Sequence, residues 1–282
     1  MTAKITALIP CKDEISNIEA CIASVRRIAD EVLVADSGSR DGTLERARML
    51  ADRVIQREYV NSGDFKNWAI PQASHPWVLI VDADERVTEE LAAEIRETMK
   101  APADCLAFSV SRRNYFLGHP LNHGDWARDE VTRLIQRDRC RYRLFTDHAE
   151  VEVPNKRVGQ LKSKLIHYTA WDTGEYLLKM MHYASQQAGL WHTQGKRPEL
   201  LHMACNAPLR FLRGYVLRAG FLDGWVGFHV AMLTAYYSFL KQFLFWQRYH
   251  GRTQDDIEPA YAAAASRDGS NLDPSAGILD AA

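Results

Sequence analysis

The chain has 282 residues, 46% of them hydrophobic and 25% charged, so it can bury a sizeable core and has the composition of an ordinary folded protein. Its formal net charge of −1 gives no overall sign of nucleic-acid binding. Its five cysteines show neither a CxxC motif nor a metal-site spacing, and no apolar leader precedes the first predicted strand, so we expect reduced thiols, no signal peptide and a cytosolic setting.

Strand and helix alternate over about the first 85 residues, which predicts a parallel α/β sheet with ligand-binding loops on one edge. Pro10 is expected to end the first strand, and Ser16 with Glu19 reads as a capping box for the first helix. The predicted elements are strands at 5–9, 31–35, 54–55 and 77–81 and helices at 17–28, 44–51 and 65–73.

After a predicted helix at 89–99, the pattern changes to strands at 106–112, 131–136, 142–145 and 158–166. We therefore divide the chain into four parts. They are an α/β half (1–100), a β-richer half of the same domain (101–172), a helical region (173–250) and a weakly ordered tail (251–282).

Residues 77–86, WVLIVDADER, are the most informative stretch. A buried strand ends in Asp82 and Asp84, and two carboxylates there are unfavourable unless they are solvated, paired or bound to a cation. Hard oxygen ligands suit Mg²⁺ or Mn²⁺ carried with a phosphorylated substrate. The segment therefore predicts a metal-assisted nucleotide site.

Four polar clusters follow the early strands and would converge on one edge of a parallel sheet. They are Asp13 with Glu14, Asp36, Lys66 with Asn67, and Asp82 with Asp84. As a nucleotide pocket, the acids would bind base and ribose, the lysine would meet phosphate, and Asp84 would hold the metal. The alternative is that these acids are helix N-caps.

The segment 211–246 is apolar and aromatic with basic residues around it. Its longest apolar stretch, 226–240, is shorter than the roughly 20 residues that span a bilayer. We expect a basic amphipathic helix pair at the headgroup level of the inner leaflet. The alternative is a helical hairpin packed on the catalytic domain or in a homo-oligomer interface.

The order and spacing of four motifs resemble an inverting family 2 glycosyltransferase of the GT-A type: ALIPCKDE, EVLVADSGSRDGT, GDFKNWAI and VLIVDADE. Many members carry two aspartates after strand two, whereas here Asp36 is followed by Ser37. The downstream segments RRNYFLGHPLNHGDW, HAEVEV and LIHYTAWD are similar to a narrower group, the lipopolysaccharide core glucosyltransferases of the WaaE type, in which Asp-Ser-Gly-Ser is common.

The resemblance implies a Rossmann-like GT-A nucleotide-diphospho-sugar transferase fold with a C-terminal helical extension, and a Mg²⁺ or Mn²⁺ cofactor. It also implies a nucleotide-binding set in which Asp36 contacts uracil: Pro10, Asp13, Glu14, Asp36, Lys66 and Asp82. Asp84 would be the metal ligand of the DxD motif. In some GT-A enzymes a histidine completes the metal shell, and here His167 is the candidate; the alternative is a structural histidine at a strand end.

An inverting transfer needs a base that takes the proton of the acceptor hydroxyl. Glu150 is the expected base, because counting back from His167 places it on the family glutamate, and Asp147 is the alternative. Glu150 could instead be a surface residue that shares a strand face with Glu152.

Aromatic and basic residues of the β-richer half suggest the acceptor side. Trp126 and Trp171 could stack on sugar rings, although buried packing explains them as well. Arg128 and Arg133 are near enough in sequence to help bind a diphosphate or an anionic acceptor.

The sequence thus predicts an inverting transferase on the cytoplasmic face of the inner membrane. It would move a hexose, expected to be glucose, from a UDP-sugar to a lipid-linked saccharide such as lipopolysaccharide inner core. No nucleic-acid partner is expected. The alternatives are a polyprenyl-phosphate glycosyltransferase, which has less need of Glu150, and a non-catalytic sugar-nucleotide-binding scaffold. A nucleotidyltransferase would need a glycine-rich basic loop that the chain lacks.

Overall fold

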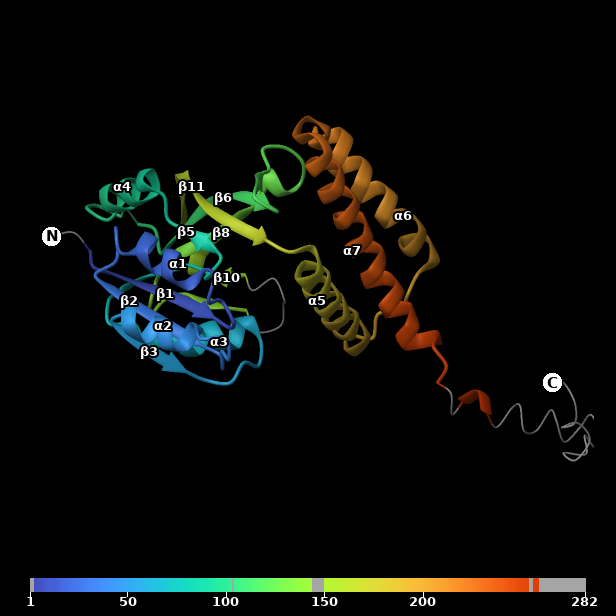
Figure 1. The fold of residues 1–282 in the computed structure, drawn as a ribbon, viewed down its shortest axis with the longest axis horizontal. Helices are drawn as coiled ribbons and strands as arrows, with labels where there is room; N and C mark the ends of the chain where they lie inside the picture. Colours follow the sequence, from blue (N-terminus) through green and yellow to red (C-terminus); the bar gives the residue numbers. More distant parts are fainter. Residues whose placement is uncertain (1–2, 103, 144–149, 254–255, 259–282) are drawn as a thin grey trace, which may run out of the picture.

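The computed structural model describes residues 3–102, 104–143, 150–253 and 256–258. Within them a mixed sheet has the strand order β3-β2-β1-β4-β8-β6-β11-β5, and β7 pairs with β6 (Figure 1). Four parallel strands form one side: β1 Ile5–Cys11, β2 Glu31–Asp36, β3 Arg53–Gln56 and β4 Trp77–Ile80. The others are β5 Glu85–Arg86, β6 Ala107–Phe116, β7 His119–Pro120, β8 Glu130–Gln136 and β11 Val158–Ala170. The α/β prediction is confirmed.

Alternate residues of the buried strands pack on opposite faces of the sheet. Ile9 joins the core under α1 (Ile18–Val25) and α4 (Glu89–Thr98), and Leu8 joins the core under α3 (Ser62–Ala69). The remaining elements before the helical region are short: α2 Thr43–Leu50, η1 Ile70–Gln72, η2 Trp126–Arg128, β9 Arg141–Tyr142, β10 Val151–Glu152 and η3 Pro154–Lys156. Both faces of the sheet are therefore covered, and a ligand can bind only at the edge where the strands end.

Pro10 does not end the first strand, contrary to the sequence prediction. Pro10 still pairs with Ala35 of β2, and the strand runs on to Cys11. The O atom of Leu8 bonds the N–H of Val81 on the β4 side, and β4 ends at Ile80. The N–H that proline lacks would face the same side as Leu8, where no strand remains to accept it.

The predicted capping box is also wrong. Asn17 is the N-cap of α1, and it makes no side-chain cap hydrogen bond. The carbonyl of Glu14 accepts from the N–H groups of Asn17 and Ile18, so a turn already serves the helix start. The carboxylate of Glu19 binds Arg46 of α2 at 2.5 Å instead of reaching back to Ser16.

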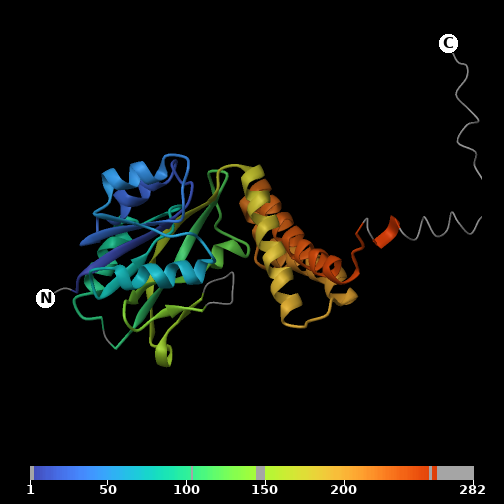
Figure 2. The same ribbon diagram turned by 90° about the horizontal axis from the view of Figure 1, so that it is seen from below.

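Three long helices stand beside the sheet domain in both views (Figures 1 and 2). They are α5 Thr173–Thr193, α6 Leu200–Phe211 and α7 Gly224–His250, and a π-helical turn η4 (Leu212–Leu217) and a 3₁₀ turn η5 (Gly220–Asp223) join α6 to α7. Met180 and Ala184 of α5 pack on Leu240 of α7. No described helix is by itself long and apolar enough to cross a bilayer. The segments 200–217 and 220–250 together have the length and composition of a membrane span, but they are bent by 72° relative to each other.

Candidate active site

Asp82 lies between two cations in the loop that joins β4 to β5. Its Oδ1 is 3.0 Å from Nζ of Lys66 on α3, and its Oδ2 accepts a short hydrogen bond from Arg133 on β8. Burial alone would raise the pKa of Asp82, but Arg133 and Lys66 outweigh it and hold the pKa far below its usual range. Burial would lower the pKa of Lys66, and Asp82 raises it instead. Both oxygens of Asp82 are therefore already occupied.

The ion pairs continue from Asp82 into a buried network. Arg133 also binds Glu85 at 2.5 Å, and Arg112 of β6 joins Glu85 at 3.2 Å to Asp129 at 2.5 Å. Lys66, Arg133 and Arg112 thus face Asp82, Glu85 and Asp129, and the network balances its own charge. Such a buried network is stable only while every member is paired.

Asp84 stands outside this balance and faces His167. Its Oδ2 is 3.5 Å from Nε2 of His167, which lies within β11 and does not follow the strand as predicted. Burial would raise the pKa of Asp84, but His167 in its protonated form lowers it, by its positive charge and by a hydrogen bond to the carboxylate. The backbone of the Asp84 loop is held by a hydrogen bond from the N–H of Tyr168 to the carbonyl of Asp84.

Asn114 of β6 decides which nitrogen of His167 carries the proton. The amide nitrogen of Asn114 donates to the carbonyl of Trp126 at 2.6 Å and to Asp129 at 3.2 Å. Its Oδ1 must therefore be the atom 2.5 Å from Nδ1 of His167, and Nδ1 must be the donor. In the neutral ring this leaves the lone pair of Nε2 facing the carboxylate of Asp84.

Two electron-pair donors that face each other at this separation fit a divalent cation between them. Imidazole and carboxylate ligands suit Mn²⁺ and related ions, and a second-shell amide that orients the histidine is usual at metal sites. Among the described residues no group of three or more His, Cys, Asp or Glu side chains could hold a metal. A bound diphosphate and water could supply the remaining ligands beside this pair.

A groove of about 650 Å³ opens at the carboxyl ends of β1, β2 and β3, on the nucleoside side expected from the sequence. It is lined by Lys12, Asp13, Ser37, Gly38, Arg40, Gln56, Arg57 and Glu58. Asp13, whose φ is 53°, accepts from the N–H of Arg40 at 2.7 Å. The groove therefore presents both carboxylate and guanidinium groups, as recognition of a base, a ribose and phosphates requires.

Asp36 lies beneath this groove and does not line it. Its carboxylate is fully buried, and Oδ1 accepts from the N–H groups of Gly38 and Ser39 at 3.0 and 3.1 Å. The residue thus shapes the loop that follows β2, and its contact with uracil stays a prediction. Pro10 is half-buried at the end of β1.

Glu14 is not among the residues that line the groove, and its carboxylate accepts a hydrogen bond from the side-chain amide of Asn17 at 2.8 Å. Burial and the negative charge of Asp84 raise its pKa, whereas the hydrogen bond from Asn17 and the charges of Lys179 and Arg86 oppose the rise. Asn67 does not face a nucleotide, because its side-chain amide pairs with both backbone groups of Tyr142 at 2.8 Å and anchors β9.

Glu150, the expected base, is exposed immediately before β10. Its carboxylate lies 3.9 Å from Arg143, and no contact with the DxD carboxylates is seen within the described ranges. Tyr142 lies on β9, which pairs with β10, and its ring is 5.4 Å from the ammonium of Lys66. The hairpin therefore starts at the site, but Asp147, the alternative base, lies outside the described residues.

Trp126 packs edge-on against Phe116 and lies 6.0 Å from the ring of Tyr176. The structure favours the packing interpretation for it. Trp171 is 54% exposed and stacked on Tyr168, so its role in stacking on a sugar stays a prediction. Arg128 is exposed on η2.

Two candidate site residues were not predicted from the sequence. No motif marks Asn114, because only the pairing of β6 with β11 brings it to His167. Lys179 lies in the first half of α5, and its charge acts on both Glu14 and Asp84. No local pattern marks Lys179 as a site residue; the helix had to be placed against the sheet first.

Residues 6–151 match the family model described as Glycosyl transferase family 2. The lipopolysaccharide core biosynthesis glycosyltransferase LpsC of Rhizobium meliloti (strain 1021) is 30% identical over 91% of this chain and 97% of its own length. An uncharacterized glycosyltransferase of Rickettsia bellii (strain RML369-C) is 28% identical over 86% of this chain and 85% of its own. A structure of glucosyl-3-phosphoglycerate synthase from Mycobacterium tuberculosis, with Mn²⁺, UDP-glucose and phosphoglyceric acid, aligns with 67% of this chain and 79% of that chain at 14% identity and a TM-score of 0.46.

Proposed function

The chain belongs to glycosyltransferase family 2, and on this premise we propose that it moves a hexose from a UDP-sugar to a lipid-linked saccharide with inversion at the anomeric carbon. Glucose is the favoured hexose, because the downstream motifs resemble the core glucosyltransferases. Lipopolysaccharide inner core is the favoured acceptor. Its support is the Rhizobium relative, a lipopolysaccharide core biosynthesis glycosyltransferase that this chain matches over nearly its whole length.

The observation that carries the proposal is the meeting of Asp84 and His167 beside the charge-balanced network of Asp82. Asp84 is the carboxylate outside the balanced network, and Nε2 of His167, which would offer a lone pair when the ring is neutral, is held toward it. Asp84 and His167 would hold a Mg²⁺ or Mn²⁺ ion, which neutralises charge on the departing diphosphate. Lys66 and Arg133 keep Asp82 rigid, so the ion-binding loop does not reorganise during the reaction.

In the proposed transfer, the acceptor oxygen bonds to the anomeric carbon as the bond from that carbon to the diphosphate oxygen breaks. The acceptor hydroxyl loses a proton, and UDP leaves with the electron pair. We propose Glu150 as the base that takes this proton, since its hairpin begins beside Lys66. Lys179 on α5 is near enough for its positive charge to lower the pKa of Asp84.

A lipid-linked acceptor would bring the enzyme to the cytoplasmic face of the inner membrane, and the proposal therefore includes peripheral membrane association. The polyprenyl-phosphate alternative differs in its nucleophile, which is already an anion and needs no base. Dependence of turnover on Glu150 therefore separates the two.

The test is UDP release from a panel of UDP-sugars by the full-length protein, with Mn²⁺ or with EDTA, and with purified lipopolysaccharide core acceptors. We expect release that needs metal and acceptor together, and a product of inverted anomeric configuration by NMR. UDP binding without release for every donor and acceptor, polyprenyl phosphate included, would identify a scaffold. Release with polyprenyl phosphate alone would identify the alternative transferase.

A further inference from the structure

The turn between α6 and α7, residues 212–225, forms a tip in which large apolar side chains face solvent. Its exposed members are Leu212 (46%), Val216 (47%), Leu217 (74%), Phe221 (48%), Leu222 (59%) and Trp225 (78%). Single exposed apolar residues are ordinary, but a dense group within one turn marks an interaction surface. The tip lies at the top of the hairpin in Figure 1, beside the loop that follows β6.

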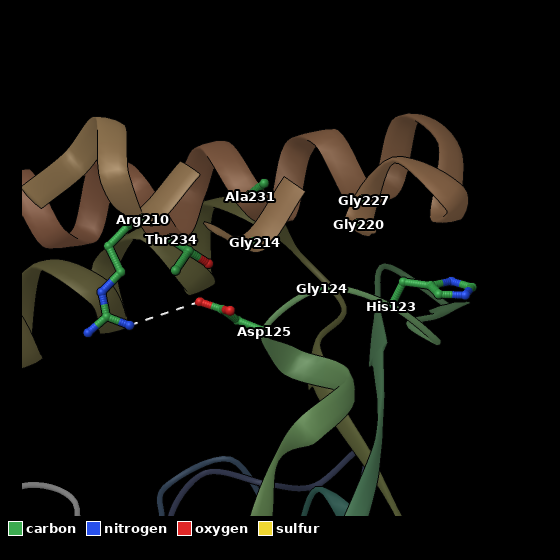
Figure 3. A pocket seen from close by; sticks show the side chains of 9 residues that line it. All are labelled: His123, Gly124, Asp125, Arg210, Gly214, Gly220, Gly227, Ala231 and Thr234. Atoms are coloured by element: carbon green, nitrogen blue, oxygen red, sulfur yellow. Dashed lines mark ion pairs between the residues drawn. The ribbon is translucent and has the colours of Figure 1, made fainter. Parts of the chain in front are cut away.

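Glycines fix the shape of this tip. A Cβ atom at Gly227 would stand 1.9 Å from the carbonyl oxygen of Gly220, and one at Gly220 would stand 2.7 Å from that of Gly214. These backbones meet where Figure 3 shows them, around a cavity of about 10 Å³, which is room for one water at most. The tip is therefore a rigid wedge, and its exposed side chains have no pocket to fold into.

Arginines surround the base of the tip. Arg213 and Arg218 lie 3.0 and 2.7 Å from the carboxylate of Asp125. Arg210 lies 3.9 Å from the same carboxylate (Figure 3). One carboxylate thus faces three guanidinium groups, whose side chains stay 47% (Arg210), 43% (Arg213) and 27% (Arg218) exposed. The acid within the tip, Asp223, does not pair with these arginines. It lies 2.8 Å from His123 and accepts hydrogen bonds from two backbone N–H groups. The base of the tip carries a net positive charge that suits phosphate headgroups.

The same arginines argue against a bilayer span. If the segments 200–217 and 220–250 crossed the bilayer together, these three guanidinium groups would lie close to the bend within the span. Charged side chains are strongly unfavourable inside a bilayer. The loop at His123 and Asp125, which belongs to the sheet domain, also packs at the bend. An interfacial position, with apolar side chains at the acyl boundary and arginines among the headgroups, fits both observations.

We propose that residues 212–225 dock the protein on an anionic phospholipid bilayer and hold its active site at a set height above the membrane. Asp125 precedes Trp126, whose carbonyl binds Asn114, and Asn114 orients His167. The docking surface and the Asp84–His167 pair therefore share one hydrogen-bonded frame. This inference deepens the proposed function, because it gives a lipid-linked acceptor a place, but the docking itself does not depend on the chemistry.

The test is co-sedimentation of the full-length protein with vesicles of phosphatidylglycerol and phosphatidylethanolamine, without donor or acceptor. Leu217→Glu together with Leu222→Glu should weaken vesicle binding by at least about tenfold, because two exposed leucines that the proposal inserts into the bilayer are exchanged for charges that the lipid repels. UDP–Mn²⁺ binding should stay unchanged in this variant. Wild-type binding should fall with salt and with phosphatidylcholine vesicles, as a headgroup interaction requires.

The matched control is Leu200→Glu with Leu201→Glu, at the far end of α6, where the two side chains are 76% and 70% exposed. This control should bind vesicles within about twofold of wild type. Equal loss in both variants, or unchanged binding of the tip variant, would overturn the proposal, and so would retention in the membrane after alkaline carbonate extraction, which indicates a span. A wild-type dimer that the tip variant splits, with no vesicle binding, would assign the tip to a second copy. Vesicle docking without UDP release would leave this inference standing and refute the proposed function.

Discussion

Nε2 of His167 on β11 faces Oδ2 of Asp84 across 3.5 Å, and Asn114 keeps a proton on the opposite nitrogen, Nδ1. The two aspartates of the DxD motif therefore have different environments. Asp82 has two cationic partners and belongs to the framework, whereas Asp84 has an oriented histidine and is open to a cation.

The first prediction concerns Asp84→Asn. This variant should lose Mn²⁺-dependent UDP binding and at least about a hundredfold in turnover, because one of two protein ligands is removed. Its melting temperature should equal or exceed that of wild type, since Asp84 lies outside the balanced network. Calorimetry with UDP and Mn²⁺ and a thermal melt check both points; wild-type turnover in this variant would remove Asp84 from the metal site.

Asp82→Asn should behave in the opposite way. It leaves Lys66 and Arg133 buried beside a neutral amide, and breaking a buried ion pair typically lowers the free energy of unfolding by about 3–5 kcal/mol. Urea denaturation of the two variants side by side measures the difference. Equal stability of the Asp82 and Asp84 variants would show that Asp82 does not have a larger structural role than Asp84.

Asn114→Ala should lower Mn²⁺ affinity by about 10–100-fold, the range typical of outer-shell partners of a metal-bound histidine. Affinity for UDP measured in EDTA should stay near wild type, since Asn114 contacts His167, Trp126 and Asp129 and not the groove. Isothermal titration in the presence and absence of metal separates this positioning role from a general loss of structure. Parallel losses under both conditions would argue for a structural role only.

Glu150→Gln should lower turnover by about 10²–10⁴-fold while UDP binding is kept, because a proton acceptor is removed without changing side-chain shape. Glu152→Gln, on the same short hairpin, is the matched control and should be nearly silent. Single-turnover assays with lipid-linked acceptor measure the effect. If Asp147→Asn is the damaging change instead, the alternative base is the correct one.

Glu31 should stabilise the fold at neutral pH and lose this effect in acid. Burial disfavours its charge, but hydrogen bonds from Thr6, Ser74 and Arg53 outweigh burial and lower its pKa from 4.5 to about 2. Because the folded pKa lies below the unfolded one, the contribution is complete above pH 4.5 and disappears as the pH falls toward 2. It amounts to about 3 kcal/mol at neutral pH. Glu31→Gln should therefore lower stability at pH 7 and flatten the acid limb of a stability–pH curve measured by urea denaturation.

The sequence alone determined the α/β class, the helical extension and the position of the DxD motif, because hydrophobic periodicity and strand-end acids are local properties of the chain. The family resemblance assigned the metal to Asp84, but the sequence could not show that Asp82 is neutralised, since its partners Lys66 and Arg133 come from α3 and β8 and meet it only after the sheet forms. Trp126 was open to two interpretations until its contacts with Phe116 and Tyr176 were in place. Charge balance, tautomer and burial depend on side chains brought together from distant segments, and such contacts leave no mark in the local sequence around any one of them.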